Sequence, residues 1–389
     1  MTLVDRTPTT SAAVLAAVRA LAPTLAERAA EIEAARRVPP DLLDRLVAAG
    51  CFRLLLPPSH GGLGADLPAA LRVFEALARA DASVGWTAMI GAGAWVDLAE
   101  LPRETFDELF RGDRDVIVAG VFNPTGQIAA ADGGYRVSGR WSFASGCEHA
   151  DWLWGNCLEG LVDGVPQLRG AVFAPDEVVI EDTWTVSGLC GTGSHHFHVT
   201  DVDLPAERTF RVDLDDPHPC IDAAIVRIPV PPLLAAAIAG VALGIAQGAL
   251  DDVVELAAGK VPLLAAAPLA ADPVFELDLA TADTELRAAR ALLYETAEAL
   301  WAAGEAGEEL ALPERARARA AAVWATERAA AVVDAAYRAG GGTALYADCP
   351  LQRRLRDVRA LTQHFLVKRG TLVTAGALLA GHDVPLGVF

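Results

Sequence analysis

The 389-residue chain has no Cys-x-x-Cys pair, few basic residues and only 6% aromatic residues. Without paired cysteine spacing, a zinc ribbon or a disulfide framework is not expected, and the six cysteines are predicted to be reduced thiols of a cytoplasmic protein. The 32 Lys and Arg residues face 51 Asp and Glu residues, which gives a net charge of -19. A surface of that sign repels phosphate backbones, so nucleic-acid binding is not expected.

Long hydrophobic runs are also scarce. The first residues contain Asp5 and Pro8 and lack the apolar centre of a signal peptide. One run, Leu233 to Leu250, is uncharged, but most of it is Ala and Gly, and it contains Gln247. This composition favours a buried core helix over a membrane span.

The residue pattern changes twice along the chain. Residues 1–113 have helical spacing of apolar side chains, and long helical patterns return over residues 223–389. Between them, residues 114–222 contain short segments rich in β-branched and aromatic residues, with a hairpin signal at Asp132–Gly134. The sequence predicts a mainly helical α+β protein with an N-terminal helical domain, a middle antiparallel β-domain (a sandwich or barrel) and a C-terminal four-helix bundle. The last helix is expected to run from Pro350 to Ala380.

One stretch of the middle region is unusual. GRWSFASGCEHADW, from Gly139 to Trp152, places three aromatic rings in fourteen residues around a Ser-Gly pair. A plain strand alternates apolar and polar residues and does not need a serine between rings. The stretch is therefore a candidate for a binding site.

Three segments carry a resemblance to a known family. The Gly139–Trp152 stretch, VSGLCGTGSHHFHVTDVDLP (Val186–Pro205) and PLQRRLRDVRALTQHF with its Arg356-Asp357 pair are similar to motifs of the acyl-CoA dehydrogenase fold. Together with the order helices, strands, helices, they cover nearly the whole chain. The W-S-F-A-S-G pattern and the Gln363-His364 pair resemble one branch of that fold, the two-component (group D) flavin-dependent monooxygenases, which hydroxylate phenols, polyketide aromatics or amines.

The resemblance implies a reduced flavin, FMNH2 or FADH2, that a separate reductase supplies and that reacts with O2 to form a C4a-hydroperoxide. Phe143 would cover one face of the flavin ring, and the Ser145 hydroxyl would reach its N5. The alternative for Ser145 is a strand-end hydroxyl that satisfies a local amide. The flavin contacts implied by the resemblance are Phe122, Asn123, Trp141, Phe143, Ser145, Gly341 and Gly342.

The branch is distinguished from the dehydrogenases by its catalytic group. A dehydrogenase needs a carboxylate base, but residues 362–365 contain no acid and neither do residues 223–250. His364 stands at the first of these places, at the edge of an expected helical stripe, and is expected to titrate near neutrality. It would deprotonate a phenol or protonate the peroxide; the alternative is a core-edge histidine bonded to a backbone carbonyl.

Trp86 lies on a helix that faces the substrate in related enzymes, so Trp86 and His364 are the predicted substrate contacts. The small residues at 91–93 leave space for a polycyclic substrate, or merely allow close helix packing. The histidines at 195, 196 and 198 have no accompanying ligand set, and no metal site is predicted.

The favoured function is therefore the oxygenase component of a two-component monooxygenase that hydroxylates an aromatic, phenolic or polycyclic, small molecule in natural-product biosynthesis or aromatic catabolism. By the resemblance it would be a homotetramer served by a flavin reductase. The alternatives are an amine N-hydroxylase, an acyl-CoA dehydrogenase with an unrecognised base, and a catalytically silent paralogue that binds a ligand or serves as a scaffold.

Overall fold

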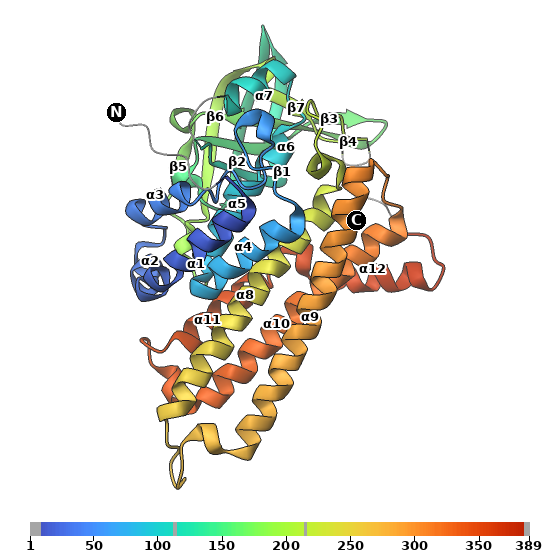
Figure 1. The fold of residues 1–389 in the computed structure, drawn as a ribbon. Coiled ribbons are helices and arrows are strands. Elements are labelled where there is room, and N and C mark those ends of the chain that lie inside the picture. The colour runs from blue at the N-terminus through green and yellow to red at the C-terminus, as the bar shows by residue number, and fades with distance from the viewer. Residues whose placement is uncertain (1–8, 112–114, 214–215, 385–389) are drawn as a thin grey trace.

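The computed structural model describes residues 9–111, 115–213 and 216–384 (Figure 1). Its N-terminal part is helical, as expected. Asp81 caps the helix that carries Trp86, because its side chain accepts a hydrogen bond from Val84 N at 3.0 Å. The helices are α1 (Ser11–Glu27), α2 (Ala29–Ala35), α3 (Pro40–Ala48), α4 (Leu67–Ala80), α5 (Ala82–Gly93), α6 (Trp95–Leu98) and α7 (Arg103–Phe110).

The middle part forms one seven-stranded sheet with the strand order β5-β6-β2-β1-β3-β4-β7. The strands are β1 (Val118–Ala131), β2 (Gly134–Ala144), β3 (Trp152–Val162), β4 (Val165–Phe173), β5 (Val179–Glu181), β6 (His195–Pro205) and β7 (Thr209–Arg211). The expected hairpin turn connects β1 and β2, with Gly133 in the left-handed region at φ 78°.

The prediction of a wholly antiparallel sandwich or barrel needs a correction, because β1 and β3 pair in parallel and the sheet is mixed. The reason is the short segment 145–151. It carries the chain from the end of β2 across the start of β1, so Trp152 begins β3 opposite Val118 and β3 runs in the direction of β1.

The C-terminal part is the helix bundle of Figure 1, made of α8 (Val230–Gly259), α9 (Pro273–Ala306), α10 (Leu312–Gly340), α11 (Pro350–Leu361) and the shorter α12 (Gly370–Leu379). Among the described residues, α8 is the one helix long and apolar enough to cross a membrane, but 89% of its apolar window is buried inside the protein. Its glycines allow close packing, since a Cβ on Gly244 would lie 2.3 Å from Glu75 O of α4. The prediction of a core helix is confirmed.

The prediction of one continuous last helix is wrong. The α-helix ends at Leu361, one 3-10 turn spans Phe365–Val367, and α12 begins at Gly370. His364 has extended backbone (φ -65°, ψ 132°), so it lies on no helical stripe. Arg319 of α10 donates to Leu366 O at 3.1 Å, and this tertiary contact satisfies a carbonyl that a helix would have used internally.

Helix α5 lies where the three parts meet, in contact with β1, α8 and α11. The last helix before the sheet, α7, ends at Phe110, and the expected domain boundary between residues 113 and 114 lies outside the described residues. The boundary between residues 222 and 223 stays a prediction; it falls between β7 and the 3-10 turn Ala224–Arg227.

Candidate flavin site

The end of β2 departs from regular strand geometry. Pairing with β6 shifts register between Trp141 and Ala144, and Phe143 has a left-handed backbone with φ 68°. Ser145 N then donates to Phe143 O at 3.0 Å, which closes a tight turn. Two residues apart on a plain strand, Trp141 and Phe143 would share a face; the bulge instead turns Phe143 outward, where 68% of it is exposed.

Four buried polar side chains form a continuous hydrogen-bonded chain that begins on α5. Trp86 Nε1 donates to Ser145 Oγ at 2.9 Å, and Ser145 Oγ lies 2.7 Å from Ser194 Oγ. Ser194 Oγ lies 2.7 Å from Thr192 Oγ1, which donates to Leu189 O at 2.8 Å. We call this set, from Trp86 to the Leu189 carbonyl, the hydroxyl chain. The sequence assigned no role to Thr192 and Ser194, although the motif Val186–Pro205 contains both.

The far end of the hydroxyl chain is fixed by α11. Asp357 Oδ1 accepts a hydrogen bond from Leu189 N at 2.7 Å, and Arg356 Nη1 donates to Ser187 O at 2.5 Å. Gly188 is required between them, because a Cβ there would lie 2.1 Å from Arg356 O. Burial, with Asp81 nearby, raises the pKa of Asp357 to about 7. The Arg-Asp pair therefore holds the loop that precedes Thr192.

His364 meets the hydroxyl chain through Trp86, since the two ring centroids are 5.7 Å apart in an edge-to-face arrangement. Burial, together with the nearby Arg319 guanidinium, lowers the pKa of His364 to about 4. The expected titration near neutrality is therefore wrong. His364 Nδ1 accepts a hydrogen bond from Leu366 N at 3.3 Å, so in the neutral ring the proton is on Nε2.

The other expected flavin contacts on the sheet divide into two groups. The Phe122 ring is half-buried and stacks on the exposed Phe365 at 6.5 Å, and the neighbouring Asn123 is exposed on the same strand. Trp141 is different: none of it is exposed, and its Nε1 donates to Asn156 O at 2.8 Å inside the core of the sheet. A ring without an exposed face cannot contact a flavin, and we leave Trp141 out of the proposed site.

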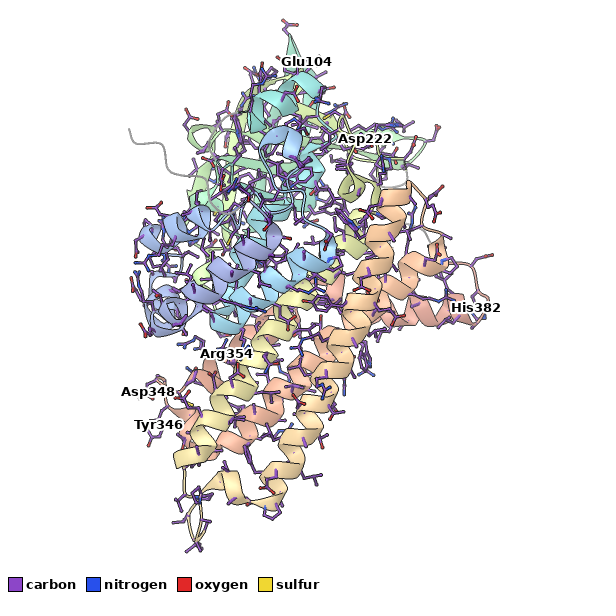
Figure 2. All side chains as sticks on the ribbon, in the orientation of Figure 1. Glu104, Asp222, Tyr346, Asp348, Arg354 and His382 are labelled. Atoms are coloured by element: carbon purple, nitrogen blue, oxygen red, sulfur yellow. The ribbon has the colours of Figure 1, made fainter. Side chains whose placement is uncertain are left out.

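The glycine turn after α10 lies far from Ser145 within the chain. Gly341 ends α10 with φ 52°, Gly342 is exposed, and Lys260 Nζ donates to Gly340 O. Tyr346, which follows this turn, lies at the opposite end of the bundle from the sheet (Figure 2). The twelve residues of α11 separate the turn from the segment of His364 by about 18 Å. One chain does not bring Gly341 and Gly342 to the other predicted flavin contacts.

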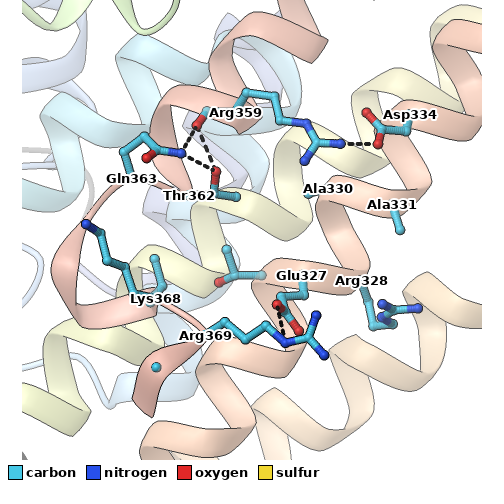
Figure 3. Close-up of a pocket in the computed structure, with 13 residues that line it drawn as sticks. Glu327, Arg328, Ala330, Ala331, Asp334, Arg359, Thr362, Gln363, Lys368 and Arg369 are labelled. Atoms are coloured by element: carbon cyan, nitrogen blue, oxygen red, sulfur yellow. Dashed lines mark hydrogen bonds and ion pairs between the residues drawn. The ribbon is translucent and has the colours of Figure 1, made fainter. Parts of the chain in front are cut away.

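A polar pocket of about 500 Å³ lies on another side of the segment that follows α11 (Figure 3). Arg359 forms an ion pair with Asp334, and Arg369 Nε lies 3.8 Å from Glu327 Oε1. Acidic side chains therefore compensate part of the positive charge that lines the pocket. Ser145, Trp86 and His364 do not line it. The pocket is lined by Thr326, Glu327, Arg328, Ala330, Ala331, Asp334, Arg359, Thr362, Gln363, Val367, Lys368, Arg369 and Gly370.

The residues around Ser145 fit a flavin ring. Such a ring needs a flat apolar partner and a polar group at its N5 edge, and Phe143 and Ser145 provide one of each. Among the described residues, Thr87 Oγ1 is buried with no hydrogen-bond partner, and the Thr87 methyl would lie 3.5 Å from a Cβ on Gly146. A buried hydroxyl without a partner is uncommon and is consistent with a group that binds there. The described residues contain no cluster of three or more His, Cys, Asp and Glu that could hold a metal ion.

Comparisons with known proteins identify the family of the chain. Residues 8–101 match the N-terminal domain, and residues 236–369 the C-terminal domain, of the acyl-CoA dehydrogenase family. The indole-3-acetate monooxygenase of Pseudomonas putida is 33% identical over 91% of this chain and 90% of its own length. The flavin-dependent monooxygenase oxygenase subunit HsaA of Rhodococcus jostii is 35% identical over 89% and 92%.

Solved structures match over almost the whole chain. The 3-HSA hydroxylase from Rhodococcus sp. RHA1 has a TM-score of 0.90 at 31% identity, with 97% of this chain and 99% of that chain covered. XiaF from Streptomyces sp., solved with FADH2 and glycerol, has a TM-score of 0.88 at 25% identity and covers 96% and 97%. The chain belongs to the flavin-dependent monooxygenases, reduced-flavin oxidoreductases with the acyl-CoA dehydrogenase fold.

Proposed function

We propose that this chain is the oxygenase component of a two-component system and hydroxylates an aromatic, phenolic or polycyclic, small molecule. The observation that carries the proposal is the contact of one side chain, Trp86, with both Ser145 and His364. The relatives include hydroxylases named for indole-3-acetate and resorcinol. A separate reductase would supply the reduced flavin, and we propose a cytoplasmic location for both proteins.

The flavin, when bound, activates O2, and the side chains named above position the reacting groups. In the proposed site the exposed Phe143 ring would cover one face of the flavin, Ser145 would reach N5, and Phe122 and Asn123 would be further flavin contacts. Trp86, which touches both Ser145 and His364, would contact the substrate. The ring contacts of Trp86 and Phe122 exclude water from the place where oxygen is transferred.

His364 acts in this proposal as a hydrogen-bond donor and not as a base. Its Nδ1 accepts from Leu366 N, its Nε2 carries the proton, and its lowered pKa keeps it neutral at pH 7. A neutral ring of this tautomer donates from Nε2 to an oxygen atom of the substrate or of the group being transferred. A neutral ring that only donates a hydrogen bond takes neither of the two roles expected from the sequence, removal of a phenol proton or protonation of the peroxide.

The test supplies purified protein with FMNH2 or FADH2, O2 and a panel of phenols, polycyclic phenols and amines, and measures hydroxylated product and H2O2 separately. We expect product from a phenol, and we expect His364→Ala, which removes the Nε2 donor, to lower product per flavin oxidised at least about tenfold while H2O2 rises. His218→Ala, at an exposed histidine, is the matched control. Product formation that is unchanged in His364→Ala would remove His364 from the site.

Two further outcomes separate the alternatives. Product from amines alone would identify an N-hydroxylase. A protein purified with bound FAD that an acyl-CoA bleaches would instead be a dehydrogenase, and a protein that binds neither redox state of flavin would be a silent paralogue.

The glycine turn bears on assembly. Since α11 separates Gly341 and Gly342 from Ser145, we propose that these glycines contact a flavin that is bound by another copy of the chain. We propose a homotetramer on this ground and on the family resemblance. Light scattering after gel filtration tests it, and a monomer that binds flavin at full strength would contradict it.

A further inference from the structure

We propose that Thr192 and Ser194 are positioning residues that fix the direction of the Ser145 hydroxyl, so that Ser145 accepts a hydrogen bond from N5–H of reduced flavin and disfavours oxidised flavin. The proposal rests on the flavin site described above and adds to it the means by which the site distinguishes the two redox states.

The direction of the hydroxyl chain is set at both of its ends. At one end the Leu189 carbonyl can only accept, so at 2.8 Å the single hydroxyl proton of Thr192 must point to it. At the other end the Trp86 indole N–H can only donate, so at 2.9 Å Ser145 Oγ must accept.

These two ends determine the direction of the hydroxyl protons of Ser194 and Ser145. Thr192 donates its hydroxyl proton to Leu189 O, so in the 2.7 Å contact with Ser194 the hydroxyl of Ser194 is the donor and Thr192 Oγ1 is the acceptor. Ser194 has then donated its only hydroxyl proton, so in the 2.7 Å contact with Ser145 the hydroxyl of Ser145 is the donor and Ser194 Oγ is the acceptor. Ser145 therefore donates into the protein and accepts from Trp86, and one lone pair of its oxygen remains open.

Burial makes this direction hard to reverse. The exposed fractions are 9% for Ser145, 3% for Ser194 and 2% for Thr192, and Trp86 is 6% exposed. Turning the Ser145 proton toward a ligand would leave the oxygen atoms of Ser145 and Ser194 2.7 Å apart with no proton between them, in a contact that is largely buried. An unsatisfied buried contact of this kind is unfavourable.

The remaining lone pair matches one redox state of the flavin. N5 of a reduced flavin carries a hydrogen and donates, whereas N5 of an oxidised flavin has only a lone pair and accepts. Ser145 in its fixed direction can bond the first and presents an oxygen lone pair to the second. The site would then hold the flavin that arrives reduced and release it once it is oxidised, which suits an enzyme that takes flavin from a separate reductase.

The test compares the dissociation constants of oxidised and reduced flavin, measured by fluorescence quenching in air and by anaerobic titration. Ser194→Ala removes the acceptor of the Ser145 proton and lets Ser145 donate to oxidised N5. We expect oxidised flavin to bind about tenfold more tightly, while reduced flavin changes less than about threefold. Ser138→Ala, at a half-buried serine of β2 that bonds Asp201, is the control and should change neither constant.

Variants at Thr192 provide an independent measurement. Thr192→Val should shift the ratio of the two constants in the same direction as Ser194→Ala, and Thr192→Ser should restore the wild-type ratio because it keeps the hydroxyl. A wild-type ratio in Ser194→Ala and Thr192→Val, with hydroxylation intact in the wild-type protein, would overturn this inference and leave the proposed function standing. Failure of the wild-type protein to bind reduced flavin would instead count against the proposed function.

Discussion

The state of His364 leads to a prediction about pH. A change from pH 8 to pH 5.5 would protonate an ordinary histidine, whose pKa is near 6.5, but the pKa of His364 is lowered to about 4 by burial. The difference of about 2.5 units corresponds to about 3 kcal/mol for placing a charge on this ring. At pH 6 only about 1% of His364 would be charged.

The sign of the linked effect on stability follows from the same shift. The folded protein binds this proton less tightly than the unfolded chain, so the contribution of neutral His364 to stability is present above pH 6.5. It is lost as the pH falls from 6.5 toward 4. Acid therefore destabilises the fold before it charges His364 in the intact site.

Two measurements check this reasoning. Product formed per flavin oxidised should be level between pH 5.5 and 8, and the nitrogen NMR signals of His364, assigned by their loss in His364→Gln, should show a neutral ring with the proton on Nε2. An inflection near pH 6.5 that disappears in His364→Gln would refute the neutral donor.

Three further predictions concern the supports of the site. Burial raises the pKa of Asp357 to about 7, so its contribution to stability is greatest below about pH 4 and is lost as the pH rises through 7; Asp357→Asn should reduce the difference in Tm between pH 5 and pH 8, and an unchanged difference would contradict this assignment. Phe143 has a left-handed backbone and an exposed ring, so Phe143→Asn should stabilise the protein by about 1 kcal/mol while flavin affinity falls, as measured by denaturant unfolding and flavin titration. A Cβ on Gly188 would meet Arg356 O, so Gly188→Ala should cost about 2 kcal/mol or more of unfolding free energy, whereas Gly160→Ala, where nothing lies within 4 Å, should cost less than about 1 kcal/mol.

Much of the fold could be predicted from the sequence, because each region has a strong local pattern. Helical spacing, short β-branched segments and the hairpin signal report local structure, and the structure has helices, a sheet and helices in that order. The parallel pairing of β1 and β3 could not be predicted, since it depends on which side of β1 the seven residues 145–151 cross. The end of α11 at Leu361 was missed because the segment after it is held by a tertiary contact, from Arg319 to Leu366 O, that no local pattern reports.

In the site, too, local patterns indicated single residues, and the features that depend on tertiary structure could not be predicted. The sequence indicated Ser145, Trp86 and His364 separately, and the structure brings the three together. It did not show that Trp141 belongs to the core, because a bulge reverses the usual alternation of the strand. The low pKa of His364 also depends on tertiary burial, which no local pattern reports.

The open segment between α11 and α12 has a consequence for the position of His364. One residue inserted into a helix rotates everything after it by about 100°. The segment that carries His364 has no such constraint, because it is not α-helical: His364 has extended backbone, and the short 3-10 turn after it is held at Leu366 O. In the proposed site, a change in the length of this segment would move His364 without rotating α11, and the hydroxyl chain beyond Trp86 would keep its contacts.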